Sequence, residues 1–319
     1  MKTPSRLESV LESGQFAVTA ELGPPKSADA EIVRKKARAL KGFADAFNVT
    51  DGQTAVVRMS SWAACVIQKE EGLEPIVQMT CRDRNRIALQ MDVLSVGALG
   101  IHNILCLSGD HMSFGNHPGA KGVYDIDSTQ LVQIVKDMRD EKTFQCGEEM
   151  DVEPRLFIGA AANPFAAPFD LRPHRLAKKV AAGADFVQTQ IVFNVPKFAE
   201  YMKRVGDLGL LDQVYVLAGV APIKSLGAAR YMAAQVPGMD VPDEIVQRMA
   251  GASAGIPKKE KRARRAAAQQ EGINICTEII EQVRQIPGVS GVHIMAIEWE
   301  DAVPTIVQQA GLLPRPAIH

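Results

Sequence analysis

The 319-residue sequence has few of the features that mark disulfide-bonded, zinc-binding or membrane proteins. Its five cysteines are an odd number without a C-x-x-C pair, which predicts neither a disulfide framework nor a zinc site. No apolar run approaches the ~20 residues that span a bilayer, and no signal-peptide pattern opens the chain. The formal net charge is −1, which provides no overall field for nucleic acid or anionic membranes. We therefore expect a soluble cytoplasmic protein that binds neither of them.

The hydrophobic pattern predicts an α/β fold in which strands and helices alternate. The composition of the chain, with 46% hydrophobic and 23% charged residues, is that of an ordinary globular protein. Short apolar runs predict eight strands, at residues 16–22, 46–50, 75–81, 103–107, 156–161, 186–193, 214–219 and 292–297. Apolar residues in helical spacing predict helices between them, at residues 28–40, 56–70, 86–96, 129–139, 171–182, 195–205 and 224–235.

The number of strands selects one architecture among the α/β folds. Repeated strand-helix units imply parallel strands joined by right-handed crossovers. Eight strands are the number in a (β/α)8 TIM barrel, and no G-x-G-x-x-G follows the first strand as it would in a dinucleotide-binding sheet. We therefore predict a single barrel domain over residues 1–319, with Cys81 and Cys106 as buried strand residues.

Two segments fall outside the repeat. In residues 1–15, Leu7, Val10 and Leu11 have helical spacing, and we expect this segment to cover the barrel bottom. Residues 240–288 form a helical insertion, with helices predicted at 242–249 and 257–286. A basic run opens the second of these helices, and its members are Lys258, Lys259, Lys261, Arg262, Arg264 and Arg265. Because the helix dipole disfavours cations there, the run is either a solvated face or a docking site for an acidic partner.

Polar residues at the carboxyl ends of the strands are the candidates for chemistry, because barrels build their ligand sites there. Glu21 closes the first strand, just before the turn Gly23-Pro24-Pro25. A carboxyl group held in a cleft has a raised pKa, which suits a general acid. The alternative is a structural glutamate paired with a lysine or arginine.

The fourth strand leads into Ser108, Gly109 and Asp110. Gly109 would let the backbone approach a ligand, and Asp110 would accept a hydrogen bond from a ring N–H or an amine. The alternative for Asp110 is a local Asx-turn. The loop at residues 109–122 has the length and glycine content of a ligand-covering loop, but its His111 and His117 form only a weak metal signal.

The sixth strand contains two amides, Gln188 and Gln190, which share a face by the period of two. A buried amide without partners costs on the order of 1–3 kcal/mol. These side chains therefore either face a bound heterocycle or pair with other amides inside the barrel.

Together, the strand-end motifs resemble those of the methylenetetrahydrofolate reductase family, flavoprotein TIM barrels that make 5-methyltetrahydrofolate. The resemblance covers about residues 15–315 and depends on the order of several short motifs. These are Glu21–Pro25 (E-L-G-P-P), Asn48–Gly52 (N-V-T-D-G), Met79–Cys81 (M-T-C), Leu107–Asp110 (L-S-G-D), and Lys179–Ala184 (K-V-A-A-G-A) with Thr189–Gln190 (T-Q).

The resemblance implies a role for each matching residue. It makes Glu21 the general acid that opens the five-membered ring of methylenetetrahydrofolate to an iminium. It places Asp110 between the pterin and the flavin, and it makes Gln190 a contact of the folate or nicotinamide. It implies a flavin cofactor, FAD or FMN, and no metal. The flavin contacts that it implies are Thr50, Gln78, Thr80, Ser108, Gly109, Asp110, Asn163 and Lys179.

The sequence also departs from the family pattern. Members commonly have Arg at the position of Ser108, His at Gln78 and Tyr at Asn163, and an Arg near the end of the eighth strand is replaced around Trp299. Arginine binds a pyrophosphate bidentately and serine cannot, so FAD and FMN both stay open. The departures resemble the branch found in one-carbon-fixing anaerobes. There the electrons come from a metal- or iron–sulfur-binding partner subunit rather than always from NAD(P)H.

Two other classes of function compete with the reductase. One is a non-redox folate-binding barrel that presents a methyl group to a corrinoid partner, and the other is a scaffold subunit that docks through the basic helix. Glu21 favours the reductase because plain binding needs no acid, and the polar strand ends argue against a scaffold. We therefore predict an oligomeric protein that reduces 5,10-methylenetetrahydrofolate to 5-methyltetrahydrofolate by hydride transfer from reduced flavin.

Overall fold

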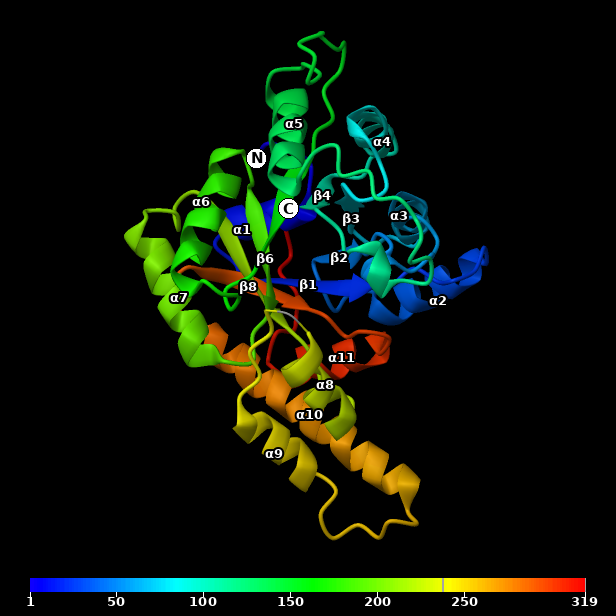
Figure 1. The fold of residues 1–319 in the computed structure, drawn as a ribbon, viewed down its shortest axis with the longest axis vertical. Coiled ribbons are helices and arrows are strands. Elements are labelled where there is room, and N and C mark those ends of the chain that lie inside the picture. Colours follow the sequence, from blue (N-terminus) through cyan, green and yellow to red (C-terminus); the bar gives the residue numbers. More distant parts are fainter. Residues whose placement is uncertain (237, 319) are drawn as a thin grey trace.

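A computed structural model describes residues 1–236 and 238–318 of the chain. At its centre, parallel strands close into an eight-stranded barrel in which each strand pairs with the next and the last pairs with the first (Figure 1). The strands are β1 Ala17–Leu22, β2 Ala46–Val49, β3 Pro75–Thr80, β4 Asn103–Leu107, β5 Phe157–Ala162, β6 Phe186–Ile191, β7 Tyr215–Val220 and β8 Val289–Ile294. The predicted (β/α)8 fold class is confirmed.

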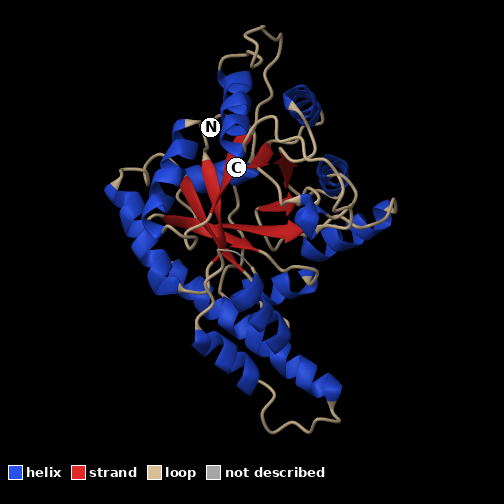
Figure 2. Ribbon diagram, in the orientation of Figure 1, coloured by secondary structure: helices blue, strands red, loops and turns tan. Residues whose placement is uncertain are grey.

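Most of the helices surround the barrel on its outside (Figure 2). The helices are α1 Arg6–Glu12, α2 Ala30–Leu40, α3 Ser61–Glu70, α4 Arg86–Ala98, α5 Ser128–Asp140, α6 Arg172–Ala181, α7 Val195–Asp207, α8 Leu226–Gln235, α9 Asp243–Gly251, α10 Lys261–Val283 and α11 Val303–Gln309. Short 3-10 helices are η1 Gln53–Ala55, η2 Met112–Phe114, η3 Phe169–Leu171 and η4 Glu300–Ala302. Side-chain caps begin several helices, as where Asp127 and Gln130 form a capping box on α5. Among the described residues, no helix combines the length and the apolar character needed to cross a bilayer.

The N-terminal helix α1 closes one end of the barrel, as the spacing of its apolar residues predicted. Leu7, Val10 and Leu11 are buried against inward-facing strand residues that include Phe157 and Phe186. The two phenylalanine rings stack with their centroids 5.1 Å apart. This end is therefore a packed core, which leaves the carboxyl ends of the strands as the end open to ligands.

The eighth strand lies three residues earlier than predicted, at Val289–Ile294 rather than 292–297. Two glycines, Gly288 and Gly291, precede the apolar run that begins at Val292. Gly288 does turn the chain, with φ of +84°, but Gly291 lies inside the strand. A Cβ on Gly291 would lie 2.3 Å from the carbonyl oxygen of Ala17 on β1, so this glycine allows the strands to approach and close the barrel.

The insertion between β7 and β8 contains α9 and α10, which extend away from the barrel in Figure 1. The second half of α10 packs on the barrel through buried residues such as Ile273, Cys276 and Ile280. Helix α10 begins at Lys261 rather than 257, so the first two lysines of the basic run precede the helix. Cys81 and Cys106 are buried, as predicted.

Candidate active site

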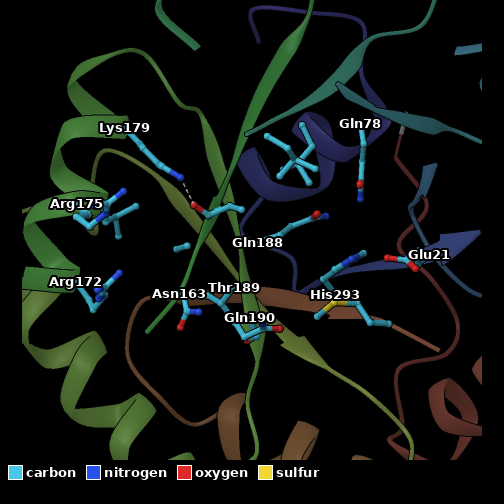
Figure 3. Close-up of a pocket in the computed structure, with 16 residues that line it drawn as sticks. Glu21, Gln78, Asn163, Arg172, Arg175, Lys179, Gln188, Thr189, Gln190 and His293 are labelled. Atoms are coloured by element: carbon cyan, nitrogen blue, oxygen red, sulfur yellow. Dashed lines mark hydrogen bonds between the residues drawn. The ribbon is translucent and has the colours of Figure 1, made fainter. Parts of the chain in front are cut away.

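The carboxyl ends of the strands surround a cavity of about 410 Å³, which we call the main cavity. Apolar residues such as Leu105, Leu107 and Met295 form part of its lining. Its polar lining, drawn in Figure 3, consists of Glu21, Gln78, Asn163, Arg172, Arg175, Lys179, Gln188, Thr189, Gln190 and His293. Glu21 and the three cations of α6 lie on opposite sides of this cavity (Figure 3).

Glu21 is half-buried at the next-to-last position of β1, opposite Asn48 of β2. Its carboxyl group makes no hydrogen bond with any residue of the described ranges. Burial, and after it the negative charge of Glu300, raise its pKa to about 7 against the opposing charges of Arg58 and Lys36. Those two cations are bonded to other carboxylates, so the structure does not pair Glu21 with a lysine or arginine. The carboxyl group can therefore hold a proton near neutral pH.

The amide of Gln188 is satisfied inside the barrel. Its Oε1 accepts from Asn48 Nδ2 at 2.7 Å, and its Nε2 donates to Asn48 Oδ1 at 3.0 Å and to Thr19 Oγ1 at 3.2 Å. Thr19 in turn lies 3.0 Å from Nδ1 of His293 on β8. For Gln188, the internal amide pair is thus the correct alternative, and the side chain shapes the cavity wall without needing a ligand.

His293 is a cavity residue that the sequence analysis missed. It is buried, and burial lowers its pKa to about 3, so its imidazole is neutral. One ring nitrogen faces Thr19, and the side chain lines the main cavity. His293 lies within both the predicted and the observed eighth strand, and the period of two that places it on the same face as Met295, another residue of the main cavity, was a usable signal.

The side chain of Gln190 accepts a hydrogen bond but donates none to the residues that the structure describes. Strand β6 is irregular between Gln188 and Ile191, and Thr189 Oγ1 there accepts from the backbone N–H of Gly219 at 2.9 Å. The Oε1 atom of Gln190 accepts from the backbone N–H of Ile191 at 3.0 Å. Its Nε2 makes no hydrogen bond within the part of the chain that the structure describes, and it remains available to a ligand in the main cavity.

Helix α6 presents Arg172, Arg175 and Lys179 to the main cavity (Figure 3). Their spacing of three and four residues places them on one helix face. Lys179 Nζ donates to the carbonyl of Ala161 at 2.5 Å, and burial together with the charge of Arg175 lowers the pKa of the lysine. Arg175 makes no hydrogen bond or ion pair within the described ranges. Of these three cations, the family motifs indicated Lys179 alone, although their i, i+3, i+7 spacing was a usable signal.

A neighbouring cavity of about 220 Å³ contains most of the other candidates. It shares Gln78 and Leu107 with the main cavity. Its further predicted residues are Thr80, Ser108, Gly109 and Asp110. Asp110 is exposed, and its Oδ2 accepts from the backbone N–H of Thr54, which lies 56 positions away, at 2.8 Å. Asp110 is therefore not the aspartate of a local Asx-turn.

The remaining candidates are held by bonds within the protein. Thr80 donates to Asp51 Oδ2 at 3.0 Å, and Thr50, which lines neither cavity, donates to Gln53 Oε1 at 2.7 Å. Asn163 Oδ1 accepts from two backbone N–H groups in its own loop. Gly109 has φ of +88°, and a Cβ there would lie 2.9 Å from Cβ of Arg82, so packing alone requires glycine.

The loop at residues 109–122 packs on the turn after β2. A Cβ on Gly115 would lie 1.8 Å from the carbonyl oxygen of Ala55, which shows how closely the two backbones meet. Thr54 and Ala55 have φ of 53° and 55°, a strained backbone at the edge of the site. His111 caps η2, and His117 borders a separate cavity, so the structure gives the two histidines different surroundings.

These features define a (β/α)8 barrel with an acid on one side of its open end and cations on the other. Residues 6–311 match the family model described as methylenetetrahydrofolate reductase. The chain belongs to this family, as its motifs indicated.

Relatives with that name occur in several organisms. Methylenetetrahydrofolate reductase 2 of Schizosaccharomyces pombe is 24% identical over 96% of this chain and 47% of its own length. Methylenetetrahydrofolate reductase (NADH) 1 of Arabidopsis thaliana is 22% identical over 98% of this chain and 51% of its own length. The 5,10-methylenetetrahydrofolate reductase of Salmonella typhimurium is 25% identical over 69% of each chain. The chain thus spans about half the length of these two eukaryotic relatives.

A solved structure shares the fold. It is an uncharacterized protein from Clostridium thermocellum that binds two copies of 5-methyl-5,6,7,8-tetrahydrofolic acid. It aligns with a TM-score of 0.64 over 96% of this chain and 100% of its own, at 12% identity. At that identity the likeness concerns the fold alone.

Proposed function

We propose that this protein reduces 5,10-methylenetetrahydrofolate to 5-methyltetrahydrofolate by hydride transfer from a bound reduced flavin. Family membership supports this, and the observation that carries it is Glu21. A carboxyl group with a pKa of about 7, free of protein hydrogen bonds among the described residues, faces a cavity at the end of the barrel where ligands bind. A general acid is most effective when its pKa lies near the working pH.

The residues around the two cavities fit a flavin. A flavin nucleotide combines a flat ring, whose edge accepts and donates hydrogen bonds, with a phosphate-bearing tail. The apolar lining of the main cavity and the side-chain amide of Gln78 suit the ring. Gln78 borders both cavities, and within the described ranges its side-chain amide makes no hydrogen bond, whereas its backbone carbonyl accepts from Ser61. Arg175 and Lys179 suit an anionic tail. These cations supply the positive charge that the family's arginine would provide at the position of Ser108, so both FMN and FAD are consistent with the site.

The chain's own residues contribute orientation and a proton. When bound, the flavin supplies the hydride. Glu21 delivers its proton to the folate nitrogen whose bond to the methylene carbon breaks, which makes that carbon electrophilic. Nε2 of Gln190 and the carboxylate of Asp110 orient the folate by donating and accepting hydrogen bonds, respectively. Neutral His293 limits the charge on the cavity wall next to Glu21.

The non-redox alternative is a barrel that binds methyltetrahydrofolate and presents it to a corrinoid partner. The ligand of the Clostridium thermocellum protein is the observation in its favour, because that protein has the same fold. Glu21 counts against it, because methyl presentation requires no acid at this position. The electron donor, either NAD(P)H or a metal- or iron–sulfur-binding partner subunit, and the oligomeric assembly in the cytoplasm remain predictions.

The first experiment distinguishes these two functions by the visible absorption spectrum of the protein. We expect purified protein, as isolated or after incubation with FAD or FMN, to show the visible absorption of an oxidised flavin, about one per chain. After anaerobic reduction, mixing with 5,10-methylenetetrahydrofolate should restore the oxidised spectrum and yield 5-methyltetrahydrofolate. A protein that binds no flavin but retains 5-methyltetrahydrofolate would establish the non-redox alternative.

A further inference from the structure

Glu21 borders a second, much smaller cavity, which we call the rear cavity. Its volume is about 20 Å³, and of the described residues only Glu21 lines both it and the main cavity. A volume above roughly 10–15 Å³ admits one water molecule. Its charged lining consists of Lys36, Arg58, Glu298 and Glu300 besides Glu21 itself. The acid therefore has a charged environment on a side that a ligand in the main cavity does not occupy.

Glu300 is the fixed carboxylate of the rear cavity. Its side chain is only 12% exposed, and its Oε1 accepts from Lys36 Nζ at 2.5 Å. Lys36 also donates to the carbonyl of Gly23 at 3.2 Å, two residues beyond the acid. Helix α2 and the start of η4 are thereby tied to the end of β1. Glu298, by contrast, is 71% exposed.

The cations of the rear cavity are committed to other partners. Arg58 donates to Pro24 O at 3.3 Å and to Glu298 at 3.4 Å, and its buried Nε has no partner within the described ranges. Lys36 is bonded to Glu300. On the main-cavity side, His293 is neutral because burial lowers its pKa to about 3. Across the rear cavity, the charged groups that face Glu21 are thus Lys36 on α2, Arg58 before α3, and Glu298 and Glu300 after β8. Across the main cavity, the charged groups are the three cations of α6.

We propose that Glu300 is a positioning residue that holds the proton on Glu21 across the rear cavity, so that the acid is loaded before the folate C–N bond breaks. The proposal deepens the proposed function and depends on it for the use of the proton. Each turnover moves one proton from Glu21 to the folate nitrogen, and one proton from solvent restores the acid. Among the surrounding charges, that of Glu300 has the largest effect on the pKa of Glu21. The ion pair with Lys36 holds the carboxylate of Glu300 in place. Because Lys36 is bonded to Glu300, it does not pair with Glu21.

The first test measures the protonation of the Glu21 carboxyl group directly, in protein without flavin or folate. In protein labelled with ¹³C-carboxyl glutamate, the Glu21 signal, assigned by its loss in Glu21→Gln, should titrate with a midpoint of about 7. In Glu300→Gln we expect the midpoint to fall by roughly half a pH unit to one unit, because a negative charge has been removed. Glu300→Asp keeps the charge and should retain most of the shift. Asp301→Asn, an equal charge change on an exposed neighbour outside the rear cavity, should leave the midpoint unchanged.

The second test measures how the rate of the folate half-reaction depends on pH. The rate of the folate half-reaction should fall as pH rises through the midpoint of Glu21, since only the protonated acid is active. In Glu300→Gln this fall should begin at lower pH, giving a roughly three- to tenfold slower reaction near pH 8 and an unchanged rate on the acidic plateau. Glu300→Gln with an unshifted Glu21 midpoint would overturn the proposal. A shifted midpoint in a protein that does not reduce folate would instead overturn the proposed function and leave the role of Glu300 in place.

Discussion

The two ends of the barrel hold their acidic side chains in different ways. At the end closed by α1, buried Asp45 accepts from Arg315 Nη2 at 2.5 Å and from the backbone N–H of Val18 at 2.9 Å. Asp185 at the same end is bonded to Arg139. At the open end, Glu21 receives no hydrogen bond within the described ranges. The same kind of side chain is thus a structural link where the fold supplies donors and a proton donor where it does not.

Removing the proton of Glu21 should have the largest effect on activity. Glu21→Gln keeps the shape of the side chain but cannot act as an acid. We expect the folate half-reaction to slow by roughly 10²–10⁴-fold, because general acid catalysis is lost. Anaerobic stopped-flow mixing of the reduced protein with 5,10-methylenetetrahydrofolate measures this step.

Flavin reduction by an electron donor is the control for this variant, because that step needs no proton from Glu21. It should change far less than the folate step. Equal slowing of both steps would show that Glu21 supports the structure of the barrel end, as Asp45 does at the other end. An unchanged folate step would remove Glu21 from the mechanism.

Removing the carboxylate of Asp45 should have the largest effect on stability. Asp45→Ala leaves the guanidinium of Arg315, whose side chain is 7% exposed, without its carboxylate partner, so that only backbone carbonyls accept from it. We expect the free energy of unfolding to fall by about 3 kcal/mol, measured by urea denaturation. Asp170→Ala removes an exposed partner of Arg204 and should cost less than about 1 kcal/mol. Equal losses in the two variants would contradict the structural role given to Asp45.

The fold could be predicted from the sequence because the patterns that indicate it are local. Hydrophobic period and the number of strands are properties of short segments, and they predicted the barrel and the covering role of α1. The error at β8 was also local, since Gly291 resembles a turn residue until the approach of β1 is known. The family motifs then placed Glu21 and Lys179 at the main cavity, while Thr50 lies outside both cavities.

The hydrogen-bond and ion-pair partners of the site residues could not be predicted from the sequence, because barrel closure brings distant parts of the chain together. Gln188 pairs with Asn48 across 140 positions, and no periodicity indicates that contact. Glu300 reaches Lys36 across 264 positions. A sequence can thus mark a residue as a candidate acid, but whether that acid is paired depends on contacts that only the closed barrel defines.

The cations of α6 should contribute to cofactor affinity by a smaller amount. Arg175→Gln removes an exposed charge that has no protein partner within the described ranges. We expect flavin to bind roughly fivefold more weakly, about 1 kcal/mol, because solvent screens an exposed cation. Lys178→Gln removes an equal charge from a residue of the same helix that does not line the main cavity, and should leave the flavin dissociation constant unchanged. Equal weakening in both variants would show a general charge effect instead of a phosphate contact.

The smallest expected effect concerns Asp110, the acid at the open end that does have a hydrogen-bond donor. Asp110→Asn can still accept from the backbone N–H of Thr54, so the strained turn at Thr54 should keep its conformation. The variant loses only a negative charge next to the proposed flavin site, which should make the flavin easier to reduce. Because the side chain is exposed, folate affinity should fall only about two- to threefold. Redox titration and folate binding to the oxidised protein measure the two quantities. If neither changes, the carboxylate of Asp110 serves only to hold the turn, as the acids at the closed end serve to hold strands.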